Sequence, residues 1–179
     1  VNAEGVDAVA NAESGGDEVS GGDGSEAGNK AETYVAQVGD TKYATLKEAI
    51  AAANAGDTVT LLAHVNLMTS TQAISKQLTI DLNGKTISST AYRTIQINAD
   101  ADLTVKDTAS GGKITNAYIG SSYPSTIYLK GTGAKFTLES GTIESDPNVT
   151  SLQSVAINSE KDMACTVNIN GGSVVVPEA

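Results

Sequence analysis

The sequence predicts an all-β fold in which the chain winds as a parallel solenoid, with three short strands per coil and about five coils. Three observations lead to this prediction. Apolar-Thr-apolar tripeptides recur along most of the chain, two further strand-like series recur between them, and glycine precedes one of these series. The 179 residues also include 18 glycines, one phenylalanine and no tryptophan, which indicates turns and a core of small aliphatic side chains.

Residues 1–33 differ in composition from the rest of the chain. They contain eight acidic residues, one basic residue and seven glycines, and so carry −7 of the total charge of −10. A segment of this kind cannot bury enough apolar surface to offset its chain entropy. We predict a disordered acidic Gly/Ser-rich leader. The first residue is Val1, which fits either a secreted protein after removal of its signal peptide or a trimmed chain.

Residues 34–56 predict a short hairpin followed by a helix. Two strand-like stretches, 34–38 and 42–44, flank a turn that contains Gly39. The next residues have the spacing of a capping box and then an apolar stripe at helical spacing: Thr45 and Glu48, then Leu46, Ala49, Ile50 and Ala53. A solenoid leaves its first coil open, so we expect this helix to close that end as a cap.

Residues 57–179 contain three interleaved series, each returning every 19 to 33 residues. The tripeptides of the first series have a central threonine: Thr60, Thr79, Thr104, Thr137 and Thr166. The second series covers residues 94–97, 126–129 and 154–157. The third follows Gly84, Gly112, Gly141 and Gly172. We interpret each series as one stack of parallel strands, and the three series together as β-helix coils.

Alternation within the strands predicts which side chains face inward. Leu103 and Phe136 share parity with other aliphatic residues and are expected in interior columns, and Cys165 is expected to be a buried thiol. The central threonines of the first series are expected to form one outer column. The only histidine, His64, is predicted to be a surface or cap residue, because no second imidazole or thiol is present nearby to complete a metal site.

The run Tyr43–Ile50, followed by Gly56–Leu61 and Leu78–Ile87, resembles the start of a right-handed parallel β-helix of the pectin-lyase-like superfamily. In particular, it is similar to non-catalytic β-helix segments of large surface proteins from Gram-positive gut bacteria. The resemblance covers residues 34–176. It implies a right-handed coil and a secreted or cell-wall location, but no particular activity, because the superfamily includes lyases, hydrolases, tailspikes and adhesins.

The residues that carry catalysis in this superfamily are not matched. Its hydrolases use an aspartate cluster with a downstream histidine and an Arg/Lys pair, whereas here His64 precedes the repeats and Arg93 is the only arginine. Its lyases use a basic residue near calcium-binding aspartates. Asp100, Asp102 and Asp107 are weak candidates for such a metal site, but we interpret them as turn residues. We therefore expect no enzymatic activity, metal or cofactor in this segment.

Four tyrosines are candidates for ligand binding: Tyr92, Tyr118, Tyr123 and Tyr128. They occupy turns and outer faces of consecutive coils, and a tyrosine ring can stack on a sugar while its hydroxyl forms hydrogen bonds. The alternative, which the sequence favours, is that Tyr118 and Tyr123 simply pack beneath the loop 115–125.

These observations predict a secreted or wall-attached structural or adhesive module whose partner is a glycan or a host surface. One alternative is the N-terminal part of a polysaccharide lyase or glycoside hydrolase whose catalytic coils are missing or degenerate. A remote alternative is an ice-binding threonine array, which Asp81, Lys106 and Glu139 would interrupt. The acidic charge argues against nucleic acid and membrane surfaces, and no apolar run is long enough to span a bilayer. Residues 174–179 lack an amphipathic cap, so we expect further coils or domains to follow.

Overall fold

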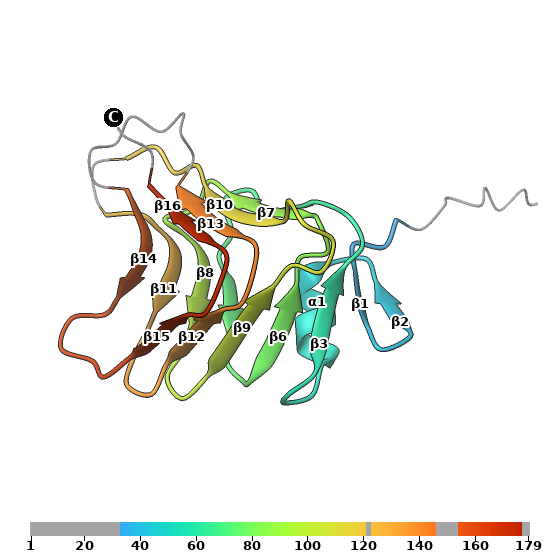
Figure 1. The fold of residues 1–179 in the computed structure, drawn as a ribbon, viewed down its shortest axis with the longest axis horizontal. Helices are drawn as coiled ribbons and strands as arrows, with labels where there is room; N and C mark the ends of the chain where they lie inside the picture. The colour runs from blue at the N-terminus through green and yellow to red at the C-terminus, as the bar shows by residue number, and fades with distance from the viewer. Residues whose placement is uncertain (1–32, 121–122, 146–153, 177–179) are drawn as a thin grey trace, which may run out of the picture. The chain divides into compact units, whose positions relative to one another are not determined.

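The structure is a computed structural model that describes residues 33–120, 123–145 and 154–176. These residues form an all-β parallel solenoid, and they contain a single short helix (Figure 1). All of them belong to one compact unit, Glu32–Ala179. The predicted acidic leader, 1–33, lies outside the described residues except for its last position.

The described chain begins with the predicted hairpin. Strands β1 (Ala36–Val38) and β2 (Thr41–Tyr43) pair antiparallel, and Gly39 in their turn has a φ of +55°. Strand β1 also pairs antiparallel with β3 (Thr58–Leu61), which the sequence did not predict. The hairpin therefore extends the first sheet of the solenoid.

The predicted helix forms as α1 (Leu46–Ala52). Thr45 Oγ1 accepts a hydrogen bond from the Glu48 N–H at 3.1 Å, and the Glu48 carboxylate accepts one from the Thr45 N–H at 3.1 Å, which is a complete capping box. The apolar stripe is buried as expected. At the other end of the helix, the Lys76 ammonium donates to the carbonyls of Ala51 and Ala53. This second contact satisfies carbonyls that a helix end leaves unpaired.

After α1 the chain visits three sheets in turn (Figure 1). The first sheet has seven strands: β1, β2, β3, β6 (Leu78–Asp81), β9 (Asp102–Lys106), β12 (Lys135–Leu138) and β15 (Thr166–Ile169). The second has five: β4 (Val65–Asn66), β7 (Thr86–Ser89), β10 (Lys113–Asn116), β13 (Thr142–Ser145) and β16 (Ser173–Val175). The third has four: β5 (Gln72–Ile74), β8 (Arg93–Ile97), β11 (Ser125–Leu129) and β14 (Val155–Ser159).

The structure differs slightly from the prediction of about five coils with three strands each. About three turns are regular, from β6 to β14. In the turn before them, β4 and β5 have only two and three residues. After them, β15 and β16 are not followed by a third-sheet strand within the described residues. The repeat pattern did not predict β4 or β5, because neither carries the residues that mark the three series.

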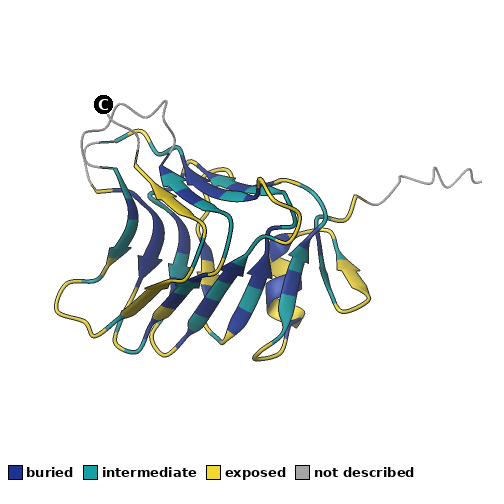
Figure 2. Cartoon of the chain, viewed as in Figure 1, coloured by how far each residue is buried: buried dark blue, intermediate teal, exposed yellow. Residues whose placement is uncertain are grey.

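Equivalent apolar residues stack in interior columns along the parallel sheets. One column of the first sheet contains Leu78, Leu103, Phe136 and Val167, and one of the second contains Ile87, Ile114, Ile143 and Val174. Leu103 and Phe136 are fully buried, which confirms their predicted inward orientation. Figure 2 shows this alternation as buried and partly exposed positions along β9.

The outer threonine column differs from the prediction at both of its ends. Thr58 and not Thr60 lies opposite Thr79, and Asn168 and not Thr166 lies opposite Thr137. Strands β3 and β15 are thus each displaced by two residues from the expected register. A shift of two keeps every apolar side chain on the inner face, so the alternation in the sequence could not distinguish the two registers.

The apolar side chains of the interior columns are partly exposed to solvent at the last described strands, β15 and β16. Val167, Ile169 and Val174 keep exposed fractions of 44%, 48% and 42%. Cys165 was predicted to be buried, but it is only partly buried, and its thiol donates to the Gly131 carbonyl over 3.4 Å. The reason is its place on the last described coil, which no later described strand of the first sheet covers.

Candidate functional site

The structure brings three of the four candidate tyrosines together around one arginine. The rings of Tyr92 and Tyr118 meet edge to face, with centroids 5.5 Å apart and an interplanar angle of 86°. The Arg93 guanidinium carbon lies 5.4 Å from the Tyr92 ring centroid and 3.2 Å from that of Tyr128. We call these four residues the Tyr–Arg cluster.

The cluster depends on the register between strands β8 and β11. Their parallel pairing places Gln96 opposite Tyr128, so that Arg93, three residues before Gln96, can reach over the Tyr128 ring. Arg93 Nη1 also donates to Gln96 Oε1 at 3.1 Å. The Arg93 Nε–H is buried and has no hydrogen-bond partner among the described residues. Unpaired buried donors are uncommon, so the packing of the guanidinium carries a free-energy cost.

The tyrosines differ in how far their rings are open to a ligand. Tyr128 is only 8% exposed, because the guanidinium of Arg93 covers one face of its ring. Tyr92 and Tyr118 are partly exposed. Tyr123 is 58% exposed and makes no ring contact with the other described tyrosines. A ligand can therefore reach Tyr92, Tyr118 and Tyr123 directly, whereas Tyr128 positions Arg93.

The three candidate aspartates occupy separate structural positions. Asp107 holds two turns of neighbouring coils: its Oδ1 accepts from the Gly84 N–H and its Oδ2 from the Gly112 N–H, each at 2.7 Å. Asp100 is a turn residue with a φ of +58°, and Asp102 lies opposite Lys135 in the first sheet. Within the described residues, no group of three histidine, cysteine or acidic side chains could hold a metal ion.

Asp81 has a role that the sequence did not indicate. It is only 5% exposed, and its Oδ1 accepts hydrogen bonds from the Asn83 N–H at 3.0 Å and the Thr108 N–H at 3.1 Å. The Thr108 hydroxyl donates to Oδ2 at 2.9 Å. Asp81 and Asp107 thus serve the backbone of the turns, and these oxygens are occupied by protein donors rather than free for a cation.

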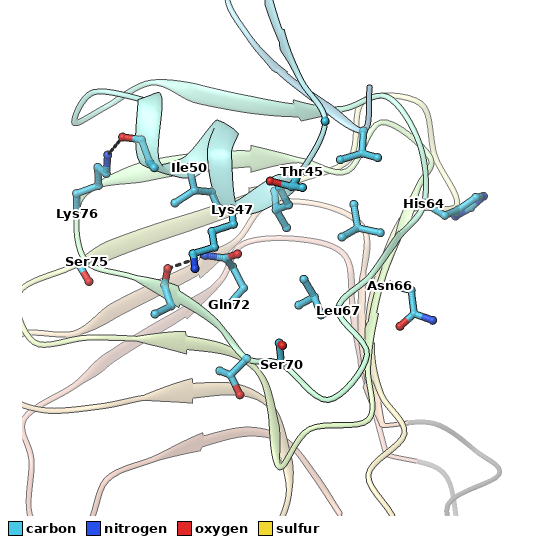
Figure 3. Close-up of a pocket in the computed structure, with 17 residues that line it drawn as sticks. Thr45, Lys47, Ile50, His64, Asn66, Leu67, Ser70, Gln72, Ser75 and Lys76 are labelled. Carbon is cyan, nitrogen blue, oxygen red and sulfur yellow. Dashed lines mark hydrogen bonds between the residues drawn. The ribbon is translucent and has the colours of Figure 1, made fainter. Parts of the chain in front are cut away.

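A cavity of about 790 Å³ lies between α1 and the short strands β4 and β5 (Figure 3). Its size is within the range of small-molecule sites. Its apolar wall includes Leu46 and Ile50 from α1 and Leu67 from the chain after β4. His64 stands at the edge of the cavity, where it is exposed and its Nδ1 accepts a hydrogen bond from the Thr86 N–H at 3.0 Å. Nothing in the sequence indicated this cavity, because neither β4 nor β5 was predicted.

Comparisons of the chain with protein-family models, with curated proteins and with solved structures find no match. In the part of the chain that the structure describes, no helix has the length and apolar character needed to cross a bilayer.

Proposed function

We propose that this chain is an extracellular structural or adhesive β-helix module that binds glycans through the Tyr–Arg cluster. The observation that carries the proposal is that the rings of Tyr92 and Tyr128 both pack against the Arg93 guanidinium, while Tyr118, from the loop after β10, packs edge to face against Tyr92. Residues from two consecutive coils contribute to this one patch.

The chemistry of the cluster suits a saccharide. Sugar rings present apolar C–H faces that stack on tyrosine rings, and their hydroxyl and carboxylate groups accept hydrogen bonds from a guanidinium. The rings of Tyr92 and Tyr118 are perpendicular and partly exposed, so both offer surface on which a sugar ring can stack. Arg93 is held beside Tyr92 by the ring of Tyr128 and by Gln96, so little side-chain entropy is lost on binding.

The proposal includes a finer description of the fold: a right-handed coil of the pectin-lyase-like type, with three strands per coil and α1 as its N-terminal cap. From β3 onward, successive strands of each sheet are parallel and joined by crossovers, which are right-handed in most proteins. Leu46, Ala49 and Ile50 join the same hydrophobic core as the solenoid strands, as a cap requires. A secreted or wall-attached location is proposed with it.

Glycan-array binding followed by titration with soluble ligand tests the function. We expect the wild-type chain to bind and the Tyr92→Ala and Tyr118→Ala variants each to lose about five- to tenfold in affinity, because each removes one stacking surface. Tyr34→Ala is the matched control, since it removes a tyrosine of the N-terminal hairpin that lies outside the cluster.

Two results would contradict the proposal. One is unchanged glycan affinity in both cluster variants. The other is depolymerisation of pectin, mucin or glycosaminoglycan by the purified chain, with or without calcium. That result would show that the chain is a lyase or hydrolase and not a binding module.

A further inference from the structure

The cavity beneath α1 contains a side chain that breaks the pattern of the solenoid interior. Parallel pairing places Ile95, Ile127 and Ile157 in one interior column of the third sheet. The same pairing places Gln72 opposite Ile95, as the first member of that column. Gln72 is 8% exposed. A polar amide therefore occupies a position where the later coils have isoleucine.

The described residues satisfy only part of the hydrogen-bonding capacity of the Gln72 amide. Its Nε2 donates to the carbonyl of the adjacent residue, Ala73, at 2.9 Å. Its Oε1 accepts no hydrogen bond from the described residues and is not among their buried unpaired atoms, so it is open to the cavity. Glutamine at this position buries less apolar surface than isoleucine would, which costs free energy. Departures of this kind from the local pattern are expected at functional positions.

A lysine faces the same space from the opposite wall. Figure 3 shows the Lys47 side chain, from α1, directed toward the Gln72 amide, which comes from β5. Lys47 forms no ion pair or hydrogen bond with the described residues. The ammonium of the other lining lysine, Lys76, already donates hydrogen bonds to carbonyls at the end of α1. Lys47 is exposed and thus provides an uncommitted, solvent-accessible ammonium on the wall that faces Gln72.

The charge of the lining contrasts with that of the chain. Two lysines and His64 line the cavity and no acidic residue does, although the whole chain carries −10. No tyrosine or phenylalanine lines it, and its apolar wall is aliphatic. Such a site is complementary to an anionic group on an aliphatic body, and it lacks the aromatic platform that a sugar prefers.

We propose that this cavity binds a small organic carboxylate with an aliphatic body. The carboxylate accepts hydrogen bonds from the Lys47 ammonium and from the Gln72 Nε2–H that is not donated to Ala73, and the aliphatic part lies against Leu46, Ile50 and Leu67. This site is separate from the Tyr–Arg cluster, so the inference does not rest on the proposed function.

Isothermal titration of the full chain with octanoate, octanol and octyltrimethylammonium tests the site. We expect saturable 1:1 binding of octanoate, about tenfold weaker binding of octanol and no binding of the cation, because only the carboxylate pairs with Lys47. Lys47→Gln should weaken octanoate about tenfold and leave octanol unchanged. Lys161→Gln, which changes an exposed lysine outside the cavity, is the control and should bind as wild type.

A second variant tests the amide. Gln72→Ile restores the isoleucine column, so we expect a folded chain with an unchanged or higher melting temperature and a smaller preference for octanoate over octanol, because only the Lys47 contact to the carboxylate remains. The inference is overturned if octanoate does not bind saturably, if octanol binds as tightly, or if Lys47→Gln leaves octanoate affinity unchanged. It is also overturned if Gln72→Ile lowers the melting temperature and retains the preference, because Gln72 would then be structural.

Discussion

At the scale of single residues, Asp107 joins two coils of the solenoid through one carboxylate. Its two oxygens accept hydrogen bonds from the Gly84 and Gly112 N–H groups, which precede successive strands of the second sheet. Gly112 cannot be replaced at this corner without displacement, since an added Cβ would lie 2.6 Å from the Leu82 Cβ and 2.7 Å from the Asp107 Cγ. The turn therefore depends on a matched Asp–Gly pair.

We predict that Asp107→Ala lowers the free energy of unfolding by about 2 to 4 kcal/mol, because two backbone N–H groups lose their acceptor. Chemical denaturation measures the change. Asp102→Ala is the control, because that side chain lies on the partly exposed face of β9, and it should cost less than about 1 kcal/mol. Equal losses in the two variants would show that the Asp107 contacts do not hold the corner.

At the scale of elements, α1 illustrates how a seven-residue helix is stabilised from outside itself. A helix this short is not stable alone in water. Here its first turn has a capping box, its last carbonyls receive the Lys76 ammonium, and its apolar side chains join the solenoid core. The capping box and the apolar side chains come from the helix segment itself, whereas the Lys76 ammonium and the core that α1 packs against come from later in the chain.

We expect Thr45→Ala to reduce stability by about 1 kcal/mol, since the helix loses the hydroxyl that accepts from the Glu48 N–H. Thermal unfolding followed by circular dichroism is the measurement. Thr69→Ala, in an exposed loop, should leave the melting temperature unchanged. A Thr45 variant as stable as wild type would mean that packing alone maintains α1.

At the scale of the whole molecule, stability is distributed unevenly along the stack of coils. Phe136 and Val167 are neighbours in one interior column, yet Phe136 is 0% exposed and Val167 44%. In a solenoid each coil contacts only its neighbours, so a side chain between two coils contributes more than one on the last coil.

Truncating these two neighbours should therefore have different effects. Phe136→Ala is expected to cost about 3 to 5 kcal/mol, because it leaves a cavity between β9 and β15, whereas Val167→Ala should cost less than about 1 kcal/mol. Equilibrium denaturation of both variants makes the comparison. Similar losses would indicate that the described end of the solenoid is covered in solution.

Much of the solenoid was predictable because its signals are local. The glycines that precede the second-sheet strands and the period-two alternation are readable in any one coil, and both predicted the observed columns. The register of β3 and β15 could not be predicted, because a shift of two residues preserves the alternation of inward and outward side chains. The sequence also missed β5, in which Gln72 replaces the aliphatic residue that marks the later coils.

The candidate sites depend on contacts between coils and were predictable only in part. The tyrosines were identified from their positions in turns and outer faces. The packing of Tyr92 and Tyr128 against Arg93 was not predicted, because it requires the register that sets Gln96 opposite Tyr128. Lys47 was not predicted as a site residue, because nothing local in the sequence shows that it lines a cavity with β5.

The antiparallel pairing of β1 with β3 has a consequence for how such a protein can lengthen over evolutionary time. All strands of an added coil run parallel to their neighbours in the sheets, whereas β1 of the hairpin runs antiparallel to β3. A further coil can therefore pair in the parallel sense only downstream of β3, where each strand follows the direction of the one before it.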